Sequence, residues 1–203
     1  MPYLPIDPAD IGRAYEPIIR INSQSGKSGV AHVLERDHGY RVPRALAIEL
    51  SQIVQVMADA RGQELSSAEI AQAFEEEYLR AAEPYALHEV GVERRSDGTA
   101  CAVVAQLQAG SQRHEARRVG NGPVDAFAAA AATVMGPVEI VDYSEHAAAP
   151  GASARAIAYV AVRAFGVERY GVGRHEDVAI AALHAVVAAC NRAARARDTA
   201  RAG

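Results

Sequence analysis

A glycine pair followed by an alanine-rich helix occurs twice in this sequence, and this repetition constrains the fold more than any other feature. The first copy is Gly120-Asn121-Gly122-Pro123, where Pro123 suits the first helical position, and the second is Gly171-Val172-Gly173. Glycine lets the backbone bend sharply and approach a ligand, and the N–H groups that begin a helix attract anions such as a carboxylate. Repetition therefore predicts a duplicated unit with two helix starts around one ligand. The alternative is that each glycine pair is only a strand-to-helix turn.

Alternating apolar and polar positions precede both helices, as half-buried antiparallel strands require. Val103 and Ala105 face one way, for example, whereas Gln106 faces the other. The expected strands lie near residues 86–95, 99–108 and 112–119 in the first unit and near 138–143, 156–165 and 167–172 in the second. The sequence thus predicts an α+β domain of two tandem β-β-β-α units, with the helices on one face of its sheets.

Between Pro43 and Glu83-Pro84 the chain follows helical spacing instead. One helix is expected to open at Pro43 and to end at Gly62, and another to begin at a capping box formed by Ser66 and Glu69. Residues 29–34 are as readily extended as helical, and residues 75–77, all glutamate, are expected on the solvated side of their helix. A small helical subdomain is therefore expected ahead of the α+β domain.

Composition excludes several classes of protein. The chain has 203 residues, half of them hydrophobic, so it is globular and not disordered. No apolar run approaches the length of a membrane span and the N-terminus lacks a signal sequence, which predicts a cytosolic protein. A formal charge of −4 gives no reason to expect nucleic acid. Cys101 and Cys190 fit reduced core residues, and the arginine-rich segment 191–197 fits a solvated helix end.

Two motifs that invite a catalytic interpretation are incomplete. Gly26-Lys27-Ser28 resembles part of a phosphate-binding loop, but the full pattern needs a glycine five residues earlier, where this sequence has Ile21. The histidines show no paired spacing with carboxylates on one predicted helix face, so no metal site is expected. The seven are His32, His38, His88, His114, His146, His175 and His184.

A series of short motifs, in order, gives the chain a family resemblance over nearly its whole length. They are Tyr3-Leu4-Pro5-Ile6-Asp7-Pro8, Gly12-Arg13, Asn22-Ser23-Gln24-Ser25-Gly26-Lys27, Asp37-His38-Gly39, Phe74-Glu75-Glu76-Glu77-Tyr78, Gly120-Asn121-Gly122-Pro123, Asp142-Tyr143-Ser144-Glu145-His146 and Gly171-Val172-Gly173. Read together, they resemble the C-terminal half of α-isopropylmalate synthase, the enzyme that commits carbon to leucine. The resemblance implies that residues 1–27 end one helical subdomain and form a linker. Residues 28–84 would form a helical accessory subdomain, and residues 85–203 a regulatory domain that dimerises.

The same resemblance implies a leucine-binding site between the helix starts and nearby loops. The matching positions are Gly120, Asn121, Gly122, Pro123, Val124, Asp125, Tyr143, Ala147, Ala154 and Val178. The leucine carboxylate would lie on backbone N–H groups and its isobutyl group against small apolar residues, with Asp125 as a candidate for the ammonium group. Tyr3 matches a tyrosine that reaches into the active site of the partner subunit in this family.

The sequence also departs from the family. The catalytic barrel, with its metal ligands and acetyl-CoA site, has no counterpart here, so no cofactor is expected in this chain and a divalent metal only in a barrel. Ser28 and Ser153 stand where the family usually has glycine and often an acid, respectively. The preferred hypothesis is the accessory and regulatory portion of such a synthase, as a fragment or a separate subunit that binds leucine as feedback inhibitor at a dimer interface. The alternatives are a subunit that supports condensation of acetyl-CoA with 2-oxoisovalerate, and a dimerisation module without a ligand.

Overall fold

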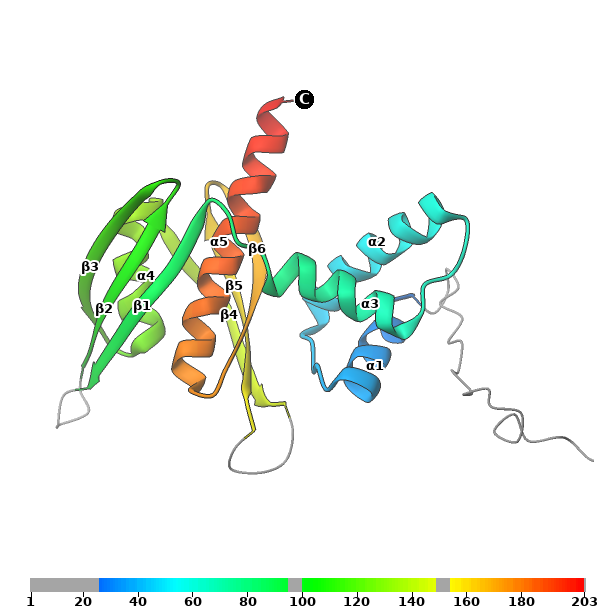
Figure 1. Cartoon of the computed structure of the whole chain (residues 1–203), viewed down its shortest axis with the longest axis horizontal. Helices are drawn as coiled ribbons and strands as arrows, with labels where there is room; N and C mark the ends of the chain where they lie inside the picture. The colour runs from blue at the N-terminus through cyan, green and yellow to red at the C-terminus, as the bar shows by residue number, and fades with distance from the viewer. Residues whose placement is uncertain (1–25, 95–99, 149–153, 203) are drawn as a thin grey trace, which may run out of the picture.

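A computed structural model describes residues 26–94, 100–148 and 154–202, which form a helical unit and an α+β unit (Figure 1). The helical unit contains α1 (Gly26–His38), α2 (Arg44–Arg61) and α3 (Ser67–Phe74), and α3 continues into a π-helical turn, Glu75–Leu79. The α+β unit contains two sheets and two helices. Its elements are β1 (Tyr85–Arg94), β2 (Cys101–Ala109), β3 (Gln112–Gly120), α4 (Pro123–Met135), β4 (Val138–Ala147), β5 (Ala156–Ala164), β6 (Val167–His175) and α5 (Val178–Ala202).

The sequence did not determine whether residues 29–34 are extended or helical. In the structure they are helical and belong to α1. Val30, Val33 and Leu34 are fully buried in the core of the helical unit. Their spacing of three and four residues puts them on one face of a helix, and packing of that face outweighs the modest helix propensity of valine. The chain leaves α1 through Gly39, whose φ of 73° is easily adopted only by glycine.

The boundaries expected for α2 and α3 are confirmed. Gly62 follows α2 in the left-handed conformation, with φ of 66°, and its N–H bonds to carbonyl groups of the last turn. The hydroxyl of Ser66 accepts a hydrogen bond from the N–H of Glu69, and the Glu69 carboxylate accepts one from the N–H of Ser66. This reciprocal capping satisfies two N–H groups that a helix start otherwise leaves without partners.

Two tandem β-β-β-α units form the remainder, as predicted. Each sheet is antiparallel with its strands in sequence order, β1-β2-β3 and β4-β5-β6, and each is followed by its helix. The duplication extends to irregularities, because the register shifts at His88 in β1 and at Val141 in β4, the fourth residue of each strand. A shared bulge position indicates that the two units are copies of one plan.

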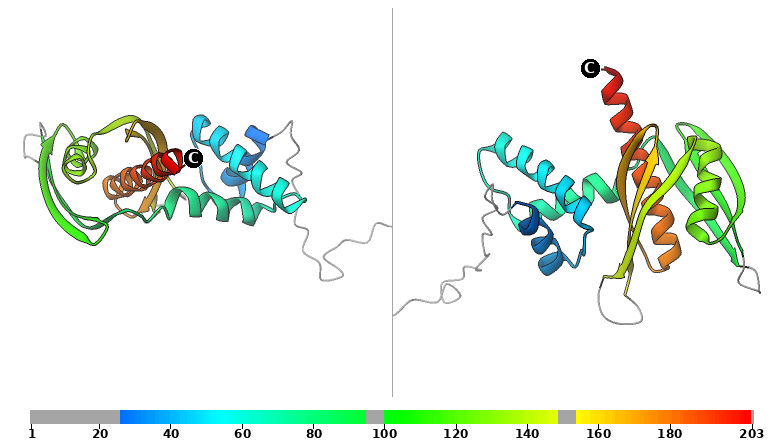
Figure 2. Two further views of the ribbon diagram at one scale, coloured as in Figure 1. Left: turned by 90° about the horizontal axis from the view of Figure 1, so that it is seen from above. Right: turned by 180° about the vertical axis from the view of Figure 1, so that it is seen from behind.

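The helices α4 and α5 lie between the two sheets (Figure 2). Alternate residues of β2 and β5, such as Val103 and Val160, point inward to a single core shared with both helices. The opposite face of the β4–β6 sheet, with Tyr159 and Val172, packs against the helical unit instead. The second sheet is therefore covered on both faces, and its strand β5 is almost wholly buried.

The second glycine pair has a different role from the one expected. Gly171 and Gly173 lie inside β6, with α5 directly upon them: a Cβ on Gly171 would be 2.3 Å from the Ala185 oxygen, and one on Gly173 would be 1.9 Å from the Ala181 oxygen. These glycines permit close packing between strand and helix and do not form a ligand-facing bend. The helix start that corresponds to Gly122 is Asp177.

Helix α5 has 25 residues and is apolar enough in composition to cross a membrane. However, 72% of its most apolar window is buried inside the protein. Within the described residues it is the core helix of the α+β unit, packed on both sheets.

Charged residues expected in solvent are partly buried. Arg192, in the arginine-rich segment, is only 4% exposed and forms ion pairs with Glu49 and Glu77. Glu75 accepts hydrogen bonds from Tyr40 and Arg80. The prediction of a solvated helix end is therefore wrong for Arg192, and the prediction of a solvated acidic side is wrong for Glu75 and Glu77, because each of these charges meets a partner distant in sequence. Glu76 and Arg195 are exposed, as predicted.

Candidate functional site

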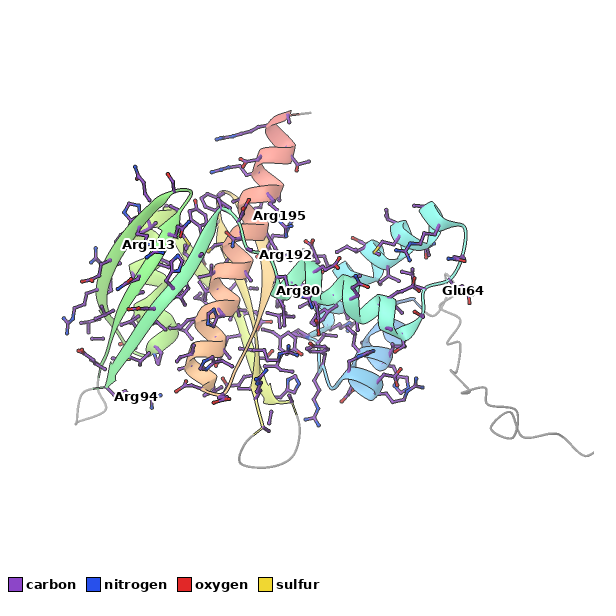
Figure 3. All side chains as sticks on the ribbon, viewed as in Figure 1. Glu64, Arg80, Arg94, Arg113, Arg192 and Arg195 are labelled. Carbon is purple, nitrogen blue, oxygen red and sulfur yellow. The ribbon has the colours of Figure 1, made fainter. Side chains whose placement is uncertain are left out.

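A cavity of about 600 Å³ lies where the two β-β-β-α units meet. It is lined by Arg94, Asn121, Gly122, Pro123, Val124, Asp125, Ile140, Tyr143, Glu145, Val178 and Ala179. These residues come from the end of β1, the start of α4, the strand β4 and the start of α5. Arg94 is at the far end of β1, beside the tip of the first sheet (Figure 3). This volume and the mixture of apolar and polar walls suit a small amphipathic metabolite.

The start of α4 supplies backbone donors to the cavity. The first intrahelical hydrogen bond runs from the N–H of Ala126 to the carbonyl of Gly122, and no side chain caps this helix. Pro123 has no N–H, so Val124 and Asp125 hold the N–H groups that lack an intrahelical partner. Gly122 is extended, with φ of −164°, so its role does not depend on a left-handed backbone.

Asp125 supports the loop that leads into α4. Its carboxylate accepts a hydrogen bond of 2.9 Å from the N–H of Asn121. Gly120 makes room for it, because a Cβ there would be 2.6 Å from Asp125 Oδ2 and 2.6 Å from the Ala126 nitrogen. Gly120 thus acts by close approach, and Asp125 already has a structural partner on the side of the loop.

The start of α5 differs from that of α4. The carboxylate of Asp177 accepts hydrogen bonds from the N–H groups of Ala179, at 2.7 Å, and Ile180, at 3.1 Å. The Asp177 N–H itself donates to Nδ1 of His175 at 2.9 Å. The Asp177 side chain therefore already satisfies the first free N–H groups of α5. The start of α5 contributes the apolar side chain of Val178, which is 40% exposed, to the wall of the cavity.

Polar side chains of β4 complete the cavity. The Tyr143 hydroxyl donates a hydrogen bond to the Glu145 carboxylate. Burial raises the pKa of Tyr143 above its ordinary value, and the hydrogen bond to Glu145 raises it further, so the phenol stays protonated. Together with Arg94 these groups give the cavity both signs of charge, which matches a zwitterion.

Comparison with known proteins identifies the family. Residues 64–194 match the family model described as LeuA allosteric (dimerisation) domain, and residues 1–35 match the alpha-isopropylmalate synthase post-catalytic domain-like family. The chain belongs to the LeuA allosteric domain family. This result confirms the resemblance that the ordered motifs predicted.

Curated relatives of this LeuA-family chain are longer enzymes. It is 45% identical over 196 residues to a 2-isopropylmalate synthase of Azotobacter vinelandii, an alignment that covers 95% of the chain and 34% of the relative. It is 43% identical over 202 residues to that of Clavibacter michiganensis subsp. michiganensis (96% and 34%) and 42% identical over 194 residues to that of Mycobacterium leprae (95% and 32%). The chain spans about a third of the length of these relatives.

The structure of this LeuA-family domain gathers most of the residues predicted for leucine. Those that line the cavity are Asn121, Gly122, Pro123, Val124, Asp125, Tyr143 and Val178. Gly120 lies behind the loop, Ala147 pairs with Ala156 at the end of β4, and Ala154 lies just before β5; these three do not line the cavity. Tyr3 lies outside the described residues.

Sequence reasoning missed four lining residues, namely Arg94, Ile140, Glu145 and Ala179. Ile140 and Tyr143 are three positions apart, so simple alternation puts them on opposite faces of β4. The bulge at Val141 changes this parity and brings both to the cavity. Glu145, two residues after Tyr143, shares its face and could have been found from the alternation alone.

Two histidines of family-like motifs make hydrogen bonds between distant segments. Nε2 of His146 bonds to the Gly39 carbonyl at 2.9 Å, and Nε2 of His38 lies 3.1 Å from the Ser67 hydroxyl. Within residues 26–94, 100–148 and 154–202, no three His, Cys, Asp or Glu side chains are grouped as metal ligands. The His146 bond joins the helical unit to β4 and so belongs to the architecture of the domain.

Proposed function

We propose that this chain is the regulatory portion of a 2-isopropylmalate synthase and that its cavity binds leucine as a feedback inhibitor. The family supports a regulatory and dimerising role, and the relatives that share this segment carry the name of the synthase. The cavity contributes the chemical reason for leucine, because it combines uncapped backbone donors, an apolar wall and charges of both signs. We further propose that it works in the cytosol as a homodimer.

One observation carries the proposal: the uncapped start of α4 and the apolar start of α5 face the same cavity. The leucine carboxylate would accept hydrogen bonds from the N–H groups of Val124 and Asp125, where the helix dipole also favours an anion. The isobutyl group would pack against Ile140 and Val178.

The ammonium group of leucine is better served by Glu145 than by Asp125. Asp125 is engaged by the Asn121 N–H and lies beside the helix start that would hold the carboxylate. Glu145 is on β4, has only the Tyr143 hydroxyl as a hydrogen-bond partner among the described residues, and lines the same cavity. A carboxylate at this position can pair with an ammonium ion while the α4 start holds the opposite end of the amino acid.

Titration calorimetry of the chain with matched ligands tests this function. L-Leucine is expected to bind, whereas 4-methylpentanoate, which lacks the ammonium group, and isoamylamine, which lacks the carboxylate, are expected to bind at least about tenfold more weakly. L-Valine and L-isoleucine test the fit of the apolar wall. Absence of heat and of a melting shift with all three amino acids would refute the sensor and leave a dimerisation module.

Participation in the condensation of acetyl-CoA with 2-oxoisovalerate is proposed only for a longer protein that includes a barrel. In that assembly the barrel would hold the divalent metal. The isolated chain is expected to show no turnover with both substrates and Mg²⁺ or Zn²⁺, because the metal is proposed to bind in the barrel and the described residues contain no group of three His, Cys, Asp or Glu side chains that could hold it. Measurable turnover by the purified chain would contradict this assignment.

A further inference from the structure

Helix α5 contacts both the candidate effector cavity and the helical unit. Its first residue, Val178, lines the cavity. Arg192 lies where the helical unit meets the second sheet, and Asn191 binds the segment that connects the helical unit to β1. The separation of 14 residues corresponds to about 21 Å along the helix axis. In Figure 3, Arg192 is near the middle of the molecule.

Arg192 connects three elements through one guanidinium group. Its Nε donates to Glu77 of the π-helical turn at 2.7 Å, one terminal nitrogen donates to Glu49 of α2, and the other donates to the carbonyl of Tyr170 in β6 at 2.6 Å. The guanidinium also stacks on the ring of Tyr78, 4.0 Å from its centre. Each side of this buried side chain therefore has a specific partner.

The charge of Arg192 persists despite its burial. Burial alone lowers the pKa of the guanidinium, but Glu49, Tyr78 and Glu77 together raise it above its ordinary value. A buried charge that loses its partners is strongly unfavourable, so the helical unit cannot withdraw from Arg192 without cost. The ion pairs therefore favour one arrangement of the two units.

Asn191, the preceding residue, fixes the connection between the units. Its amide nitrogen donates to the carbonyls of Ala81, at 2.6 Å, and Tyr85, at 2.8 Å, and its amide oxygen accepts from the Tyr85 N–H at 2.8 Å. Asn191 is fully buried. The segment from the helical unit to β1 is thus held at both ends by a single side chain of α5.

Apolar packing between the units is incomplete beside these contacts. A second cavity of about 390 Å³ lies among the connecting segment, β6 and α5, with Leu79, Tyr85, Val172 and His184 in its walls. Apolar contacts have no preferred direction and permit sliding, whereas hydrogen bonds and ion pairs fix orientation. Hydrogen bonds of His146 to Gly39 and of Arg174 to Tyr40 also join the units, but the contacts of Asn191 and Arg192 are polar contacts that α5 itself makes, and they fix the orientation of the helical unit relative to this helix.

We propose that Asn191 and Arg192 form a lock that makes the helical unit and the α+β unit one rigid body, so that a shift of α5 at the cavity moves the helical unit. The lock itself requires only the contacts above. Its use in regulation rests on the proposed function, since leucine can bias the position of α5 only if it binds beside Val178.

Spin labels on the two units measure the lock without any ligand. Glu64 and Arg113 are exposed at opposite ends of the molecule (Figure 3), and the native Cys101 and Cys190 are buried, so Glu64→Cys and Arg113→Cys direct the labels. The starting protein is expected to give one narrow distance distribution. Arg192→Met should broaden it at least about twofold, whereas Arg201→Met, a matched change at an exposed position of the same helix, should leave it unchanged.

A second variant keeps the test decisive if Arg192→Met does not fold. Glu49 is half-buried on α2, outside the core of the α+β unit, so Glu49→Ala should fold and broaden the distribution less, in the same direction. A broad distribution in the starting protein, or a narrow one in whichever of these two variants folds, would overturn the lock.

Hydrogen exchange with leucine tests the regulatory use separately. Leucine should slow amide exchange in α2 and in residues 75–79 of the starting protein and of Arg201→Met, but only in the α+β unit of Arg192→Met or Glu49→Ala. Slowing in α2 of these lock variants would overturn the coupling. If leucine does not bind at all, the proposed function fails, while the label distances still decide the lock.

Discussion

The two β-β-β-α units share one plan but differ in what surrounds them. Both place a bulge at the fourth residue of their first strand, yet α4 has 13 residues and no side-chain cap, whereas α5 has 25 residues and is capped by Asp177. The second sheet also carries the helical unit on its outer face. The first copy therefore has a helix start without a side-chain cap, which the proposed function assigns to a ligand, while the second copy packs against the helical unit.

The strongest test of this comparison removes the guanidinium on which the second unit depends. Arg192→Ala is expected to lower the free energy of unfolding by about 3–5 kcal/mol, because Glu49 then keeps a partly buried charge without its partner and Glu77 retains only the longer contact with Arg195. Urea denaturation measures the change. The exposed Arg113 of the first unit is the control, and an equal loss for Arg113→Ala would show that the units do not differ in this respect.

The second largest effect is expected where β6 packs closely against α5, a contact that β1 of the first unit lacks at Gly91. Gly173→Ala is expected to cost about 3 kcal/mol, because the added Cβ would meet the Ala181 oxygen of α5. Gly91→Ala in β1 introduces the same methyl group where nothing lies within 4 Å. Urea melts of both variants compare the two positions, and a small loss at Gly173 would show that α5 can lift from β6 at little cost.

Adding a side-chain cap to α4, like the one that Asp177 provides for α5, should make the two helix starts alike and block the proposed leucine site. Gly122 is extended and a Cβ there meets nothing within 4 Å, so Gly122→Asp is compatible with the backbone. The new carboxylate would occupy the N–H groups proposed for leucine and weaken binding at least about tenfold, with stability changed by only a few tenths of a kcal/mol. Calorimetry and thermal melting measure the two quantities. Gly122→Ala, which adds no acceptor, is the control, and unchanged affinity in Gly122→Asp would place the carboxylate elsewhere.

Removing the cap of α5 is the converse experiment. Asp177→Ala is expected to lower the free energy of unfolding by about 1 kcal/mol, because the N–H groups of Ala179 and Ile180 lose their acceptor. Asp177→Asn retains an acceptor and should recover most of the loss. A melt of Asp177→Ala that matches the starting protein would mean that this cap contributes nothing to stability.

The smallest expected effect is a dependence on pH confined to the second unit. Burial lowers the pKa of His184 in the folded protein, and the neighbouring His175 lowers it further. The unfolded chain then binds a proton more readily than the folded chain, so stability decreases as pH falls below the ordinary histidine pKa of about 6.5. Urea melts at pH 7.5 and 5.5 should differ less in His184→Gln than in the starting protein. The same slope in both would exclude His184 as the cause.

The repeated architecture was predictable because alternation and capping are local signals. The strands, the capping box at Ser66 and Glu69, and the end of α2 at Gly62 all follow from residues within a few positions of one another. Helix α1 was ambiguous because valines are acceptable in strands, and only burial of one face against α2 and α3 decides in favour of a helix.

The less predictable features depend on contacts between distant residues. Arg192 resembles its exposed neighbours in sequence, and its burial follows from Glu49, 143 positions earlier. The second glycine pair has the same spacing as the first, but its position directly beneath α5 makes it a site of close strand–helix packing. Ile140 joined the cavity only through the bulge at Val141, which no alternation pattern reveals. Local chemistry thus located the start of α4, whereas its asymmetry with α5 required the structure.

The capping of α5 by Asp177 has a consequence for stoichiometry. A fold duplicated within one polypeptide could in principle accept two equivalent anions, one per helix start. Because the start of α5 is already satisfied by its own side chain, the two duplicated units as described offer one helix start for a carboxylate, that of α4, and we predict saturation at one equivalent of amino acid per chain.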